Sequence, residues 1–258
     1  MCGVAYGVEA GVCTIAMDEP EKRNALSDAL LDALLEAFAR AREDHDARCV
    51  VLASTHPRTW SAGGDLGGFT SDAPLSVKHA GLERFPRLFT AIGTLGKPVI
   101  AAIGGHCLAG AFGLALSCDL IVATESSKFG TPEMEVGVFP FMIAALIQRN
   151  VPRKRATELM LLGDRISADE AHALGVVNRV VADDGLDAAV GAWATKLASR
   201  SPLLMRMGKD ALWRQQDLPL EDAWDHLRSQ LALSFATEDI REGVTAFFEK
   251  REPRWTGR

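Results

Sequence analysis

Three short, continuous runs of apolar residues constrain the fold of this chain more than any other feature. They cover residues 49–53, 98–103 and 120–123. A strand that is apolar along its whole length has both faces buried, which is typical of a parallel sheet. Between the runs, apolar residues recur at helical spacing after the N-cap residue Ser27, and the small residues of 108–117 predict a further helix. This alternation predicts an α/β fold built from parallel βα units.

The last quarter of the chain has a different organisation, because helical patterns fill most of its length. Ser201–Pro202 has the N-cap and first-turn chemistry of a helix start, and Thr237 begins another helix. We therefore predict an α/β core over residues 1–195 and a helical region over 196–258, which packs on the core or on a neighbouring subunit. The basic run 251–258 is expected to be a solvated tail.

Composition and charge limit the partners of the chain. With 258 residues, of which 48% are hydrophobic, it can bury a core without cross-links. Its net charge of −6 argues against nucleic acid, whose phosphates require clustered Lys and Arg. The longest apolar stretch, 139–147, is far shorter than the ~20 residues of a membrane-spanning helix, and the N-terminus shows no secretory signal. We therefore expect a cytoplasmic protein with neither a nucleic-acid nor a membrane partner.

The cysteines favour a reducing compartment over a cross-linked or metal-binding protein. They occur at irregular spacing and no two form a CxxC pair. We interpret them as buried free thiols, with neither a zinc site nor a disulfide framework. The five are Cys2, Cys13, Cys49, Cys107 and Cys118.

Two glycine-bearing segments, 60–66 and 104–113, are the strongest candidates for a functional site. Neither contains GxGxxG, nor GxxxxGK followed by Ser or Thr, so nucleotide hydrolysis and hydride transfer lose their main support. Both place small residues at the carboxyl end of a strand, where α/β proteins bind ligands. Missing side chains let a ligand approach the backbone, and two amides that meet on one oxygen form an oxyanion hole. The spacing is equally compatible with glycines that serve only turns and close helix packing.

The two glycine-bearing segments belong to the longer motifs SAGGDL and GGHCLAGAFGLALSCDL. These resemble the first and second oxyanion-hole motifs of the enoyl-CoA hydratase/isomerase superfamily, also called the crotonase superfamily. FGTPEMEVGVFP resembles the loop with a catalytic carboxylate, and the likeness extends to EKRNAL, LLGDRISADEAHALGVVNRVV and ATEDIREGVTAFFEKREPRW. These segments cover nearly the whole chain in the family's order. The resemblance implies the ClpP/crotonase fold, with a ββα superhelix core over 1–195 and a C-terminal helical trimerisation region over 196–258.

The resemblance also implies roles for individual residues. The amides of Gly64 and Gly110 would polarise a thioester carbonyl, and Glu133 would be the general acid/base. CoA would be present only as part of an acyl-CoA substrate, with no other cofactor and no metal. The implied assembly is a homotrimer or a dimer of trimers. The residues that would hold CoA are Arg23, Ala25, Leu26, Ala62, Gly63, Asp65 and Leu66, with Phe248 and Lys250 contributed across a subunit interface.

Gly113 departs from the pattern of the family's hydratases, because it occupies the place of the first of their two catalytic glutamates. Addition of water needs one group to deprotonate the water and a proton source for C2, and two carboxylates divide that work. Moving a double bond from C3 to C2 needs a single carboxylate. We therefore expect double-bond isomerisation with Glu133 as the only acid/base.

The bulky apolar residues at 141–147 agree with this expectation, although plain core packing is an alternative role for them. The family's hydratases usually have a glycine-rich turn here. A drier pocket wall would disfavour water and would raise the pKa of Glu133. Two alternatives stay open: a hydratase with a non-standard second acid/base, or an acyl-CoA-binding protein with little or no catalysis. The candidates for that second residue are His106, Glu135, Asp72 and His79.

Overall fold

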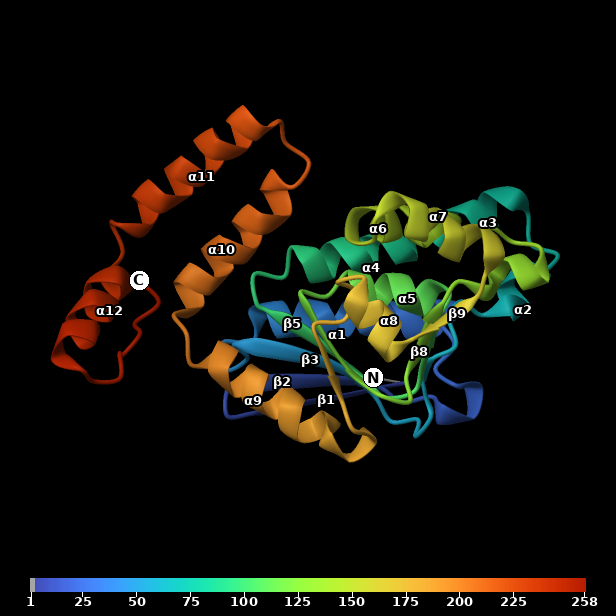
Figure 1. Ribbon diagram of the computed structural model, residues 1–258, viewed down its shortest axis with the longest axis horizontal. Coiled ribbons are helices and arrows are strands. Elements are labelled where there is room, and N and C mark those ends of the chain that lie inside the picture. Colours follow the sequence, from blue (N-terminus) through green and yellow to red (C-terminus); the bar gives the residue numbers. More distant parts are fainter. Residues whose placement is uncertain (1–2) are drawn as a thin grey trace.

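The computed structural model describes residues 3–258, so Cys2 lies outside the described residues (Figure 1). Its centre is a six-stranded sheet in the order β1-β2-β3-β5-β7-β10. The first two strands form an antiparallel hairpin, and every later pair of neighbours is parallel, which confirms the predicted α/β architecture. The strands are β1 (Val4–Glu9), β2 (Val12–Met17), β3 (Cys49–Ser54), β5 (Val99–Ile103), β7 (Leu120–Thr124) and β10 (Arg179–Val181).

The three apolar runs form the central strands β3, β5 and β7, and their side chains alternate between two hydrophobic clusters. On one face, Val50 and Leu52 join the larger cluster beneath α1 (Asp28–Glu43), α4 (Arg84–Gly93) and α5 (Gly110–Leu116). On the other face, Cys49 and Val51 pack against α9 (Leu186–Ala198). Figure 1 shows α9 on the opposite side of the sheet from the other three helices. Both faces are therefore covered, as the continuous apolar runs predict.

A second, four-stranded sheet in the order β4-β6-β8-β9 stands beside the first. Its strands β4, β6 and β8 follow β3, β5 and β7 along the chain, which gives the repeated ββα pattern. The predicted helix over 108–117 is wrong at its beginning, because Leu108 ends β6. Strands of three residues are too short to show a periodicity in the sequence. The four are β4 (Thr59–Ser61), β6 (His106–Leu108), β8 (Lys128–Gly130) and β9 (Arg165–Ser167).

The remaining elements of the core are short helices in the connections between the strands and the larger helices. α2 and α3 lie at the end of the molecule opposite the last helix of the chain in Figure 1, whereas α6 reaches the loop at residues 216–219, where Arg149 pairs with Asp217 at 3.1 Å. The short helices are η1 (Pro20–Lys22), α2 (Leu66–Phe69), α3 (Leu75–Leu82), η2 (Pro132–Val136), α6 (Phe141–Asn150), α7 (Arg153–Leu162), α8 (Ala168–Ala173) and η3 (Asp183–Gly185).

The last three helices form an extension that we call the arm: α10 (Pro202–Gln215), α11 (Leu220–Ser234) and α12 (Glu238–Glu249) (Figure 1). The N-caps are where the sequence predicts them, since the hydroxyls of Ser201 and Thr237 accept backbone hydrogen bonds from Leu204 and Ile240. The core continues to Ala198, three residues beyond the predicted boundary at 195, because Ala198 itself packs in the cluster beside β3.

Residues 251–258 are largely exposed, as their basic composition predicts, but hydrogen bonds hold them against the arm. The indole nitrogen of Trp255 donates to the carbonyl of Ser199 at 2.7 Å. The buried carboxylate of Asp239 accepts from the amides of Thr256 at 2.7 Å and Gly257 at 3.1 Å. These single hydrogen bonds leave no periodic pattern in the sequence. They fasten the end of the described chain to the base of the arm.

A half-buried ion pair helps to tie the arm to the core. The Lys209 ammonium on α10 lies 2.6 Å from the Asp119 carboxylate, which also accepts from the Val99 amide at the start of β5. The lysine side chain is only 6% exposed. A buried charge without its partner is strongly destabilising, whereas an intact pair adds little beyond an apolar contact. The pair therefore fixes where α10 docks.

We expect Asp119→Asn to lower the free energy of unfolding by roughly 1–3 kcal/mol, because the buried Lys209 ammonium loses its countercharge at a site that water partly reaches. Urea denaturation measures the change. The matched control is Asp225→Asn, which removes an exposed partner of Arg228 at 3.0 Å; it should cost less than about 0.5 kcal/mol. Equal effects of the two substitutions would show that the burial of Lys209 gives its ion pair no special role in stability.

Candidate active site

Three loops that follow neighbouring strands of the second sheet carry the predicted chemical residues. β4, β6 and β8 are parallel to one another, so the loops after them leave the same edge of the sheet. Gly64 follows β4, Gly110 follows β6 and Glu133 follows β8. The Ala109 amide donates to the Gly130 carbonyl at 2.8 Å, which joins the second loop to the end of β8. This is the carboxyl-end edge at which α/β proteins bind ligands.

The backbone amides of Gly64 and Gly110 lie close together. A Cβ atom built on Gly110 would lie 3.5 Å from the Gly64 nitrogen, and one built on Gly63 would lie 3.2 Å from the Gly110 nitrogen. Gly110 is the first residue of α5, so its amide has no acceptor within the helix. No hydrogen bond in the described part of the chain uses the Gly64 amide. Two free amides at one place can stabilise a developing negative charge on oxygen.

A strained residue holds this arrangement in place. Ala109 has φ 52° and ψ −132°, a conformation that residues other than glycine rarely adopt. Its methyl group fits only because Gly63 has no side chain: a Cβ on Gly63 would lie 2.5 Å from the Ala109 Cβ. The strain turns the chain sharply from β6 into α5 and exposes the Gly110 amide. Backbone strain of this kind is typical of functional sites.

The residues predicted to hold the adenine end of CoA lie side by side in two hydrogen-bonded segments. The Leu26 amide donates to the Gly63 carbonyl at 2.7 Å, and the Ala62 amide donates to the Arg23 carbonyl at 3.0 Å. The structure therefore brings the two predicted sets of residues together. One set is Arg23, Ala25 and Leu26, and the other is Ala62, Gly63, Asp65 and Leu66. The Asp65 carboxylate caps α2 by accepting from the Gly67 amide.

Asn24 is a structural residue of these segments that the sequence reading missed. It is fully buried, has a positive φ of 49°, and its side chain donates to the Ser54 hydroxyl and to the Trp60 carbonyl. Its own carbonyl accepts from the Ser61 hydroxyl at 2.6 Å. An asparagine between Arg23 and Ala25 is a recognisable signal, because Asn tolerates the left-handed conformation better than other side chains.

Phe248 and Lys250 are the two predicted CoA contacts that a single chain does not bring to the site. Both belong to the end of α12 in the arm, at the opposite end of the molecule from α2 and α3 (Figure 1). The Phe248 side chain is 77% exposed. Their contact with CoA across a subunit interface stays a prediction.

Glu133 is the titratable residue of this edge with the most perturbed environment. It lies in η2, which is anchored by the buried Thr131 hydroxyl donating to the Leu159 carbonyl at 2.6 Å. Its Oε2 atom is buried without a hydrogen-bond partner among the described residues. Burial raises the pKa of Glu133 to about 7. A carboxyl with this pKa exchanges protons readily near neutral pH, as a general acid/base requires.

The raised pKa predicts that Glu133→Gln makes the folded protein more stable at pH 8, by on the order of 2 kcal/mol. Between pH 4.5 and 7 the folded protein retains a proton that the unfolded chain has released, so stability falls as the pH rises through this window. Urea unfolding at pH 4 and pH 8 measures the difference between wild type and variant. A gain that is the same at both pH values would contradict a titrating Glu133 with a desolvated carboxyl group.

The four candidates for a second acid/base do not form a second desolvated carboxylate beside Glu133. Asp72, His79 and Glu135 are exposed. His106 begins β6, whereas Gly110 follows the other end of that strand. The His106 Nδ1 atom is buried without a partner in the described chain, and burial lowers the pKa of this imidazole. It therefore resembles a packed neutral histidine more than a base of this site.

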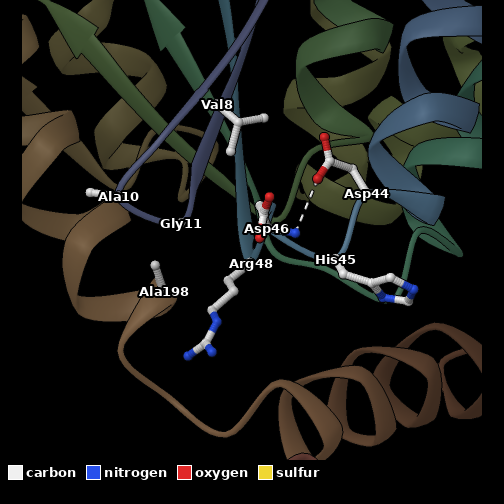
Figure 2. Close-up of a pocket in the computed structure, with 8 residues that line it drawn as sticks. All are labelled: Val8, Ala10, Gly11, Asp44, His45, Asp46, Arg48 and Ala198. Atoms are coloured by element: carbon white, nitrogen blue, oxygen red, sulfur yellow. Dashed lines mark hydrogen bonds between the residues drawn. The ribbon is translucent and has the colours of Figure 1, made fainter.

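A cavity of about 560 Å³ lies elsewhere, at the turn of the β1–β2 hairpin. Figure 2 shows it between Ala10 and Gly11 of that turn, the segment 44–48 after α1, and Ala198 at the end of α9. Its polar side chains come from surface positions, and the hydrogen bond drawn joins the Asp46 amide to Asp44. None of its lining residues belongs to the loops of Gly64, Gly110 or Glu133, so we assign it no part in the chemistry.

The structure gives two further results about membranes and metals. None of the helices within residues 3–258 is long and apolar enough to cross a membrane. Within the same range, His, Cys, Asp and Glu side chains do not gather in groups of three or more that could hold a metal ion.

Comparisons with known proteins agree with this geometry. The sequence model of the family described as enoyl-CoA hydratase/isomerase matches residues 7–258. A putative enoyl-CoA hydratase of Thermus thermophilus is 34% identical over 251 residues, which are 96% of this chain and 99% of that protein. The carnitinyl-CoA dehydratase of Salmonella enteritidis is 34% identical over 257 residues, covering 96% and 95% of the two chains.

Solved structures extend the likeness to the whole fold. The crystal structure of an enoyl-CoA hydratase from Mycobacterium smegmatis superposes with a TM-score of 0.95 at 35% identity, over 99% of both chains. Membership of one family therefore accounts for both the ββα core and the order of the motifs. The resemblance seen in the sequence is confirmed. This chain belongs to the enoyl-CoA hydratase/isomerase family, the crotonase superfamily.

Proposed function

We propose that this acyl-CoA enzyme is an enoyl-CoA isomerase, which moves a double bond from C3 to C2 with Glu133 as its single acid/base. The observation that supports the proposal is that position 133 has a carboxyl group whereas position 113 has none. Glu133 has a buried carboxyl oxygen and a pKa raised to about 7, whereas Gly113 offers no second carboxylate. One carboxylate is sufficient for a proton transfer that begins and ends on the substrate.

The proposed reaction uses only groups of this chain and the substrate. The Glu133 carboxylate removes a proton from C2 of a 3-enoyl-CoA, and the electron pair moves into the thioester carbonyl. The amides of Gly64 and Gly110 stabilise the oxygen of the resulting dienolate. The Glu133 carboxyl then returns the proton to C4, which leaves the double bond between C2 and C3. No atom is gained or lost, and CoA takes part only as a portion of the substrate.

The test uses the purified protein with two substrates, a 3-enoyl-CoA and a trans-2-enoyl-CoA. The absorbance of the conjugated thioester rises on isomerisation and falls on hydration. The proposal expects a rise with the 3-enoyl substrate and little change with the 2-enoyl substrate. A fall with the latter would identify a hydratase. No change with either, together with measurable acyl-CoA binding, would identify a protein that only binds.

A hydratase is the second candidate, because the similar proteins bear the names enoyl-CoA hydratase and carnitinyl-CoA dehydratase. Such an activity needs a second acid/base that this chain does not have at position 113. The exposed side chains of Glu135, Asp72 and His79 would have to move toward the site on substrate binding to supply it. This requirement is why we rank hydration second.

The proposed assembly is a homotrimer, or a dimer of trimers, formed through the arm. Support comes from large apolar side chains that the arm exposes in a single chain; Phe247 and Phe248 are 78% and 77% exposed. An isolated chain would rarely leave so many apolar groups in water. Sedimentation equilibrium measures the assembly, and a monomer at micromolar concentration would contradict it. Others of these side chains are Leu220, Trp224, Leu231 and Phe235.

A cytoplasmic location remains part of the proposal. Four cysteines of the described chain are free thiols, and Cys13, Cys49 and Cys107 among them are fully buried. Free thiols of this kind are typical of a reducing compartment.

A further inference from the structure

Ile143 occupies the space that any side chain at position 113 would need. A Cβ atom on Gly113 would lie 2.2 Å from Ile143 Cγ2, 2.8 Å from Ile143 Cβ and 3.3 Å from Phe89 Cζ. Contacts under 3.0 Å require the neighbour to move. Ile143 has no freedom to do so, because it is fully buried and its β-branched side chain is stiff within helix α6.

The space that a side chain at position 113 would need lies next to the free amides of Gly64 and Gly110. Gly110 and Gly113 are three residues apart on α5, so they lie on the same face of that helix. α4 lays two aromatic rings along this face: Phe85 Cε1 would lie 3.0 Å from a Cβ on Gly110, and Phe89 contacts the place of a Cβ on Gly113. The two ring centroids are 6.1 Å apart. Hydrocarbon side chains therefore line the helix face beside the amides at both positions.

We infer that Ile143 is the specificity-determining residue of this site, which excludes water and a second carboxylate from the side of the reacting carbons. Positions 113 and 143 then act as a pair: a glutamate at 113 requires the absence of a side chain at 143. The inference rests on the proposed isomerase function and names the residue that disfavours hydration. Glu133 keeps its proton-transfer role, and the apolar wall leaves no position for a water molecule to attack C3.

The first test is a stability cycle on the two positions. Gly113→Ala should lower Tm by roughly 5 °C or more in the wild-type background, because it overpacks the contact with Ile143. In an Ile143→Gly background the same substitution should raise Tm, since it refills space and favours the helix. Ile143→Ala, which removes the 2.2 Å contact and keeps the 2.8 Å contact, should give an intermediate result.

A matched control excludes a general sensitivity of the core. Gly93 on α4 is equally crowded, since a Cβ there would lie 2.2 Å from the Trp213 ring. Gly93→Ala should lower Tm by the same amount in the wild-type and the Ile143→Gly backgrounds, because Trp213 and not Ile143 crowds position 93. If Gly113→Ala also behaves additively with the substitution of Ile143, the inference is overturned.

The second test asks whether the pair sets the reaction. The double variant Gly113→Glu with Ile143→Gly should hydrate trans-2-enoyl-CoA about 100-fold faster than Gly113→Gln with Ile143→Gly, which has the same size but no carboxylate. Gly113→Glu alone should gain no hydration and should lose stability. Equal hydration by the single and double glutamate variants would overturn the role of Ile143.

The two proposals fail in different ways. If the wild-type protein does not isomerise a 3-enoyl-CoA, the proposed function fails, while the Tm cycle still reports whether Ile143 fills the space at position 113. If the wild-type protein isomerises but the cycle shows no coupling, the inference about Ile143 fails alone.

Discussion

Glu133→Gln is expected to lower kcat for isomerisation of a 3-enoyl-CoA by roughly 10²–10⁴-fold. Glutamine has nearly the same shape as glutamate but cannot accept the C2 proton. Affinity for the acyl-CoA should be retained, because no part of the CoA site depends on this carboxyl. Single-turnover kinetics measures the chemical step, and calorimetric titration with a saturated acyl-CoA measures binding.

The neighbouring carboxylate provides the control for this experiment. Glu135 lies in the same helix η2 but is exposed, so Glu135→Gln should keep wild-type kcat. In the wild-type protein kcat/KM should rise with pH through about 7 and then level off, because the base must be ionised. A rate that ignores pH over this range, or a fully active Glu133→Gln, would remove Glu133 from the mechanism.

Gly110→Ala is expected to lower kcat/KM by roughly 10²–10³-fold while leaving the fold intact. The added methyl group would lie 3.5 Å from the Gly64 nitrogen, in the space where both amides must reach the thioester oxygen. Alanine is well tolerated at the first position of a helix, and Phe85 needs to shift only slightly from its 3.0 Å contact. The assay is the same isomerisation, with circular dichroism to verify the fold.

Gly191→Ala is the matched control for Gly110→Ala. Gly191 lies in α9, on the far face of the main sheet, and a Cβ there would meet no atom within 4 Å. This variant should keep its activity and gain a little stability from helix propensity. An unimpaired Gly110→Ala would show that the amide pair does not hold the reacting oxygen.

The strands and helices that the sequence predicts well are those with a long apolar pattern. β3, β5 and β7 are buried on both faces, and such burial leaves a continuous apolar run that needs no knowledge of neighbours. The strands of the second sheet leave no such apolar pattern in the sequence, because they contain three residues each. The Asp119–Lys209 pair escapes the sequence for another reason: its members are ninety residues apart, and only the docking of α10 joins them.

Part of the candidate site could also be predicted from the sequence, and part could not. The predictable part consists of the loops with local motifs, which contain Gly64, Gly110 and Glu133. That three separate loops leave one sheet edge follows from the parallel pairing of β4, β6 and β8. The apolar character of 141–147 suggests a dry wall, but the contact of Ile143 with Gly113 depends on how α6 packs on α5, which no local pattern encodes.

The bonds between residues 255–257 and the base of the arm also set an order of events during synthesis. A ribosome makes the chain from its N-terminus, so every strand of both sheets has emerged well before Trp255 and Gly257. The arm's base, at Ser199 and Asp239, gains these partners only after Gly257 has left the exit tunnel. We therefore expect the core to be folded before these bonds close the base of the arm.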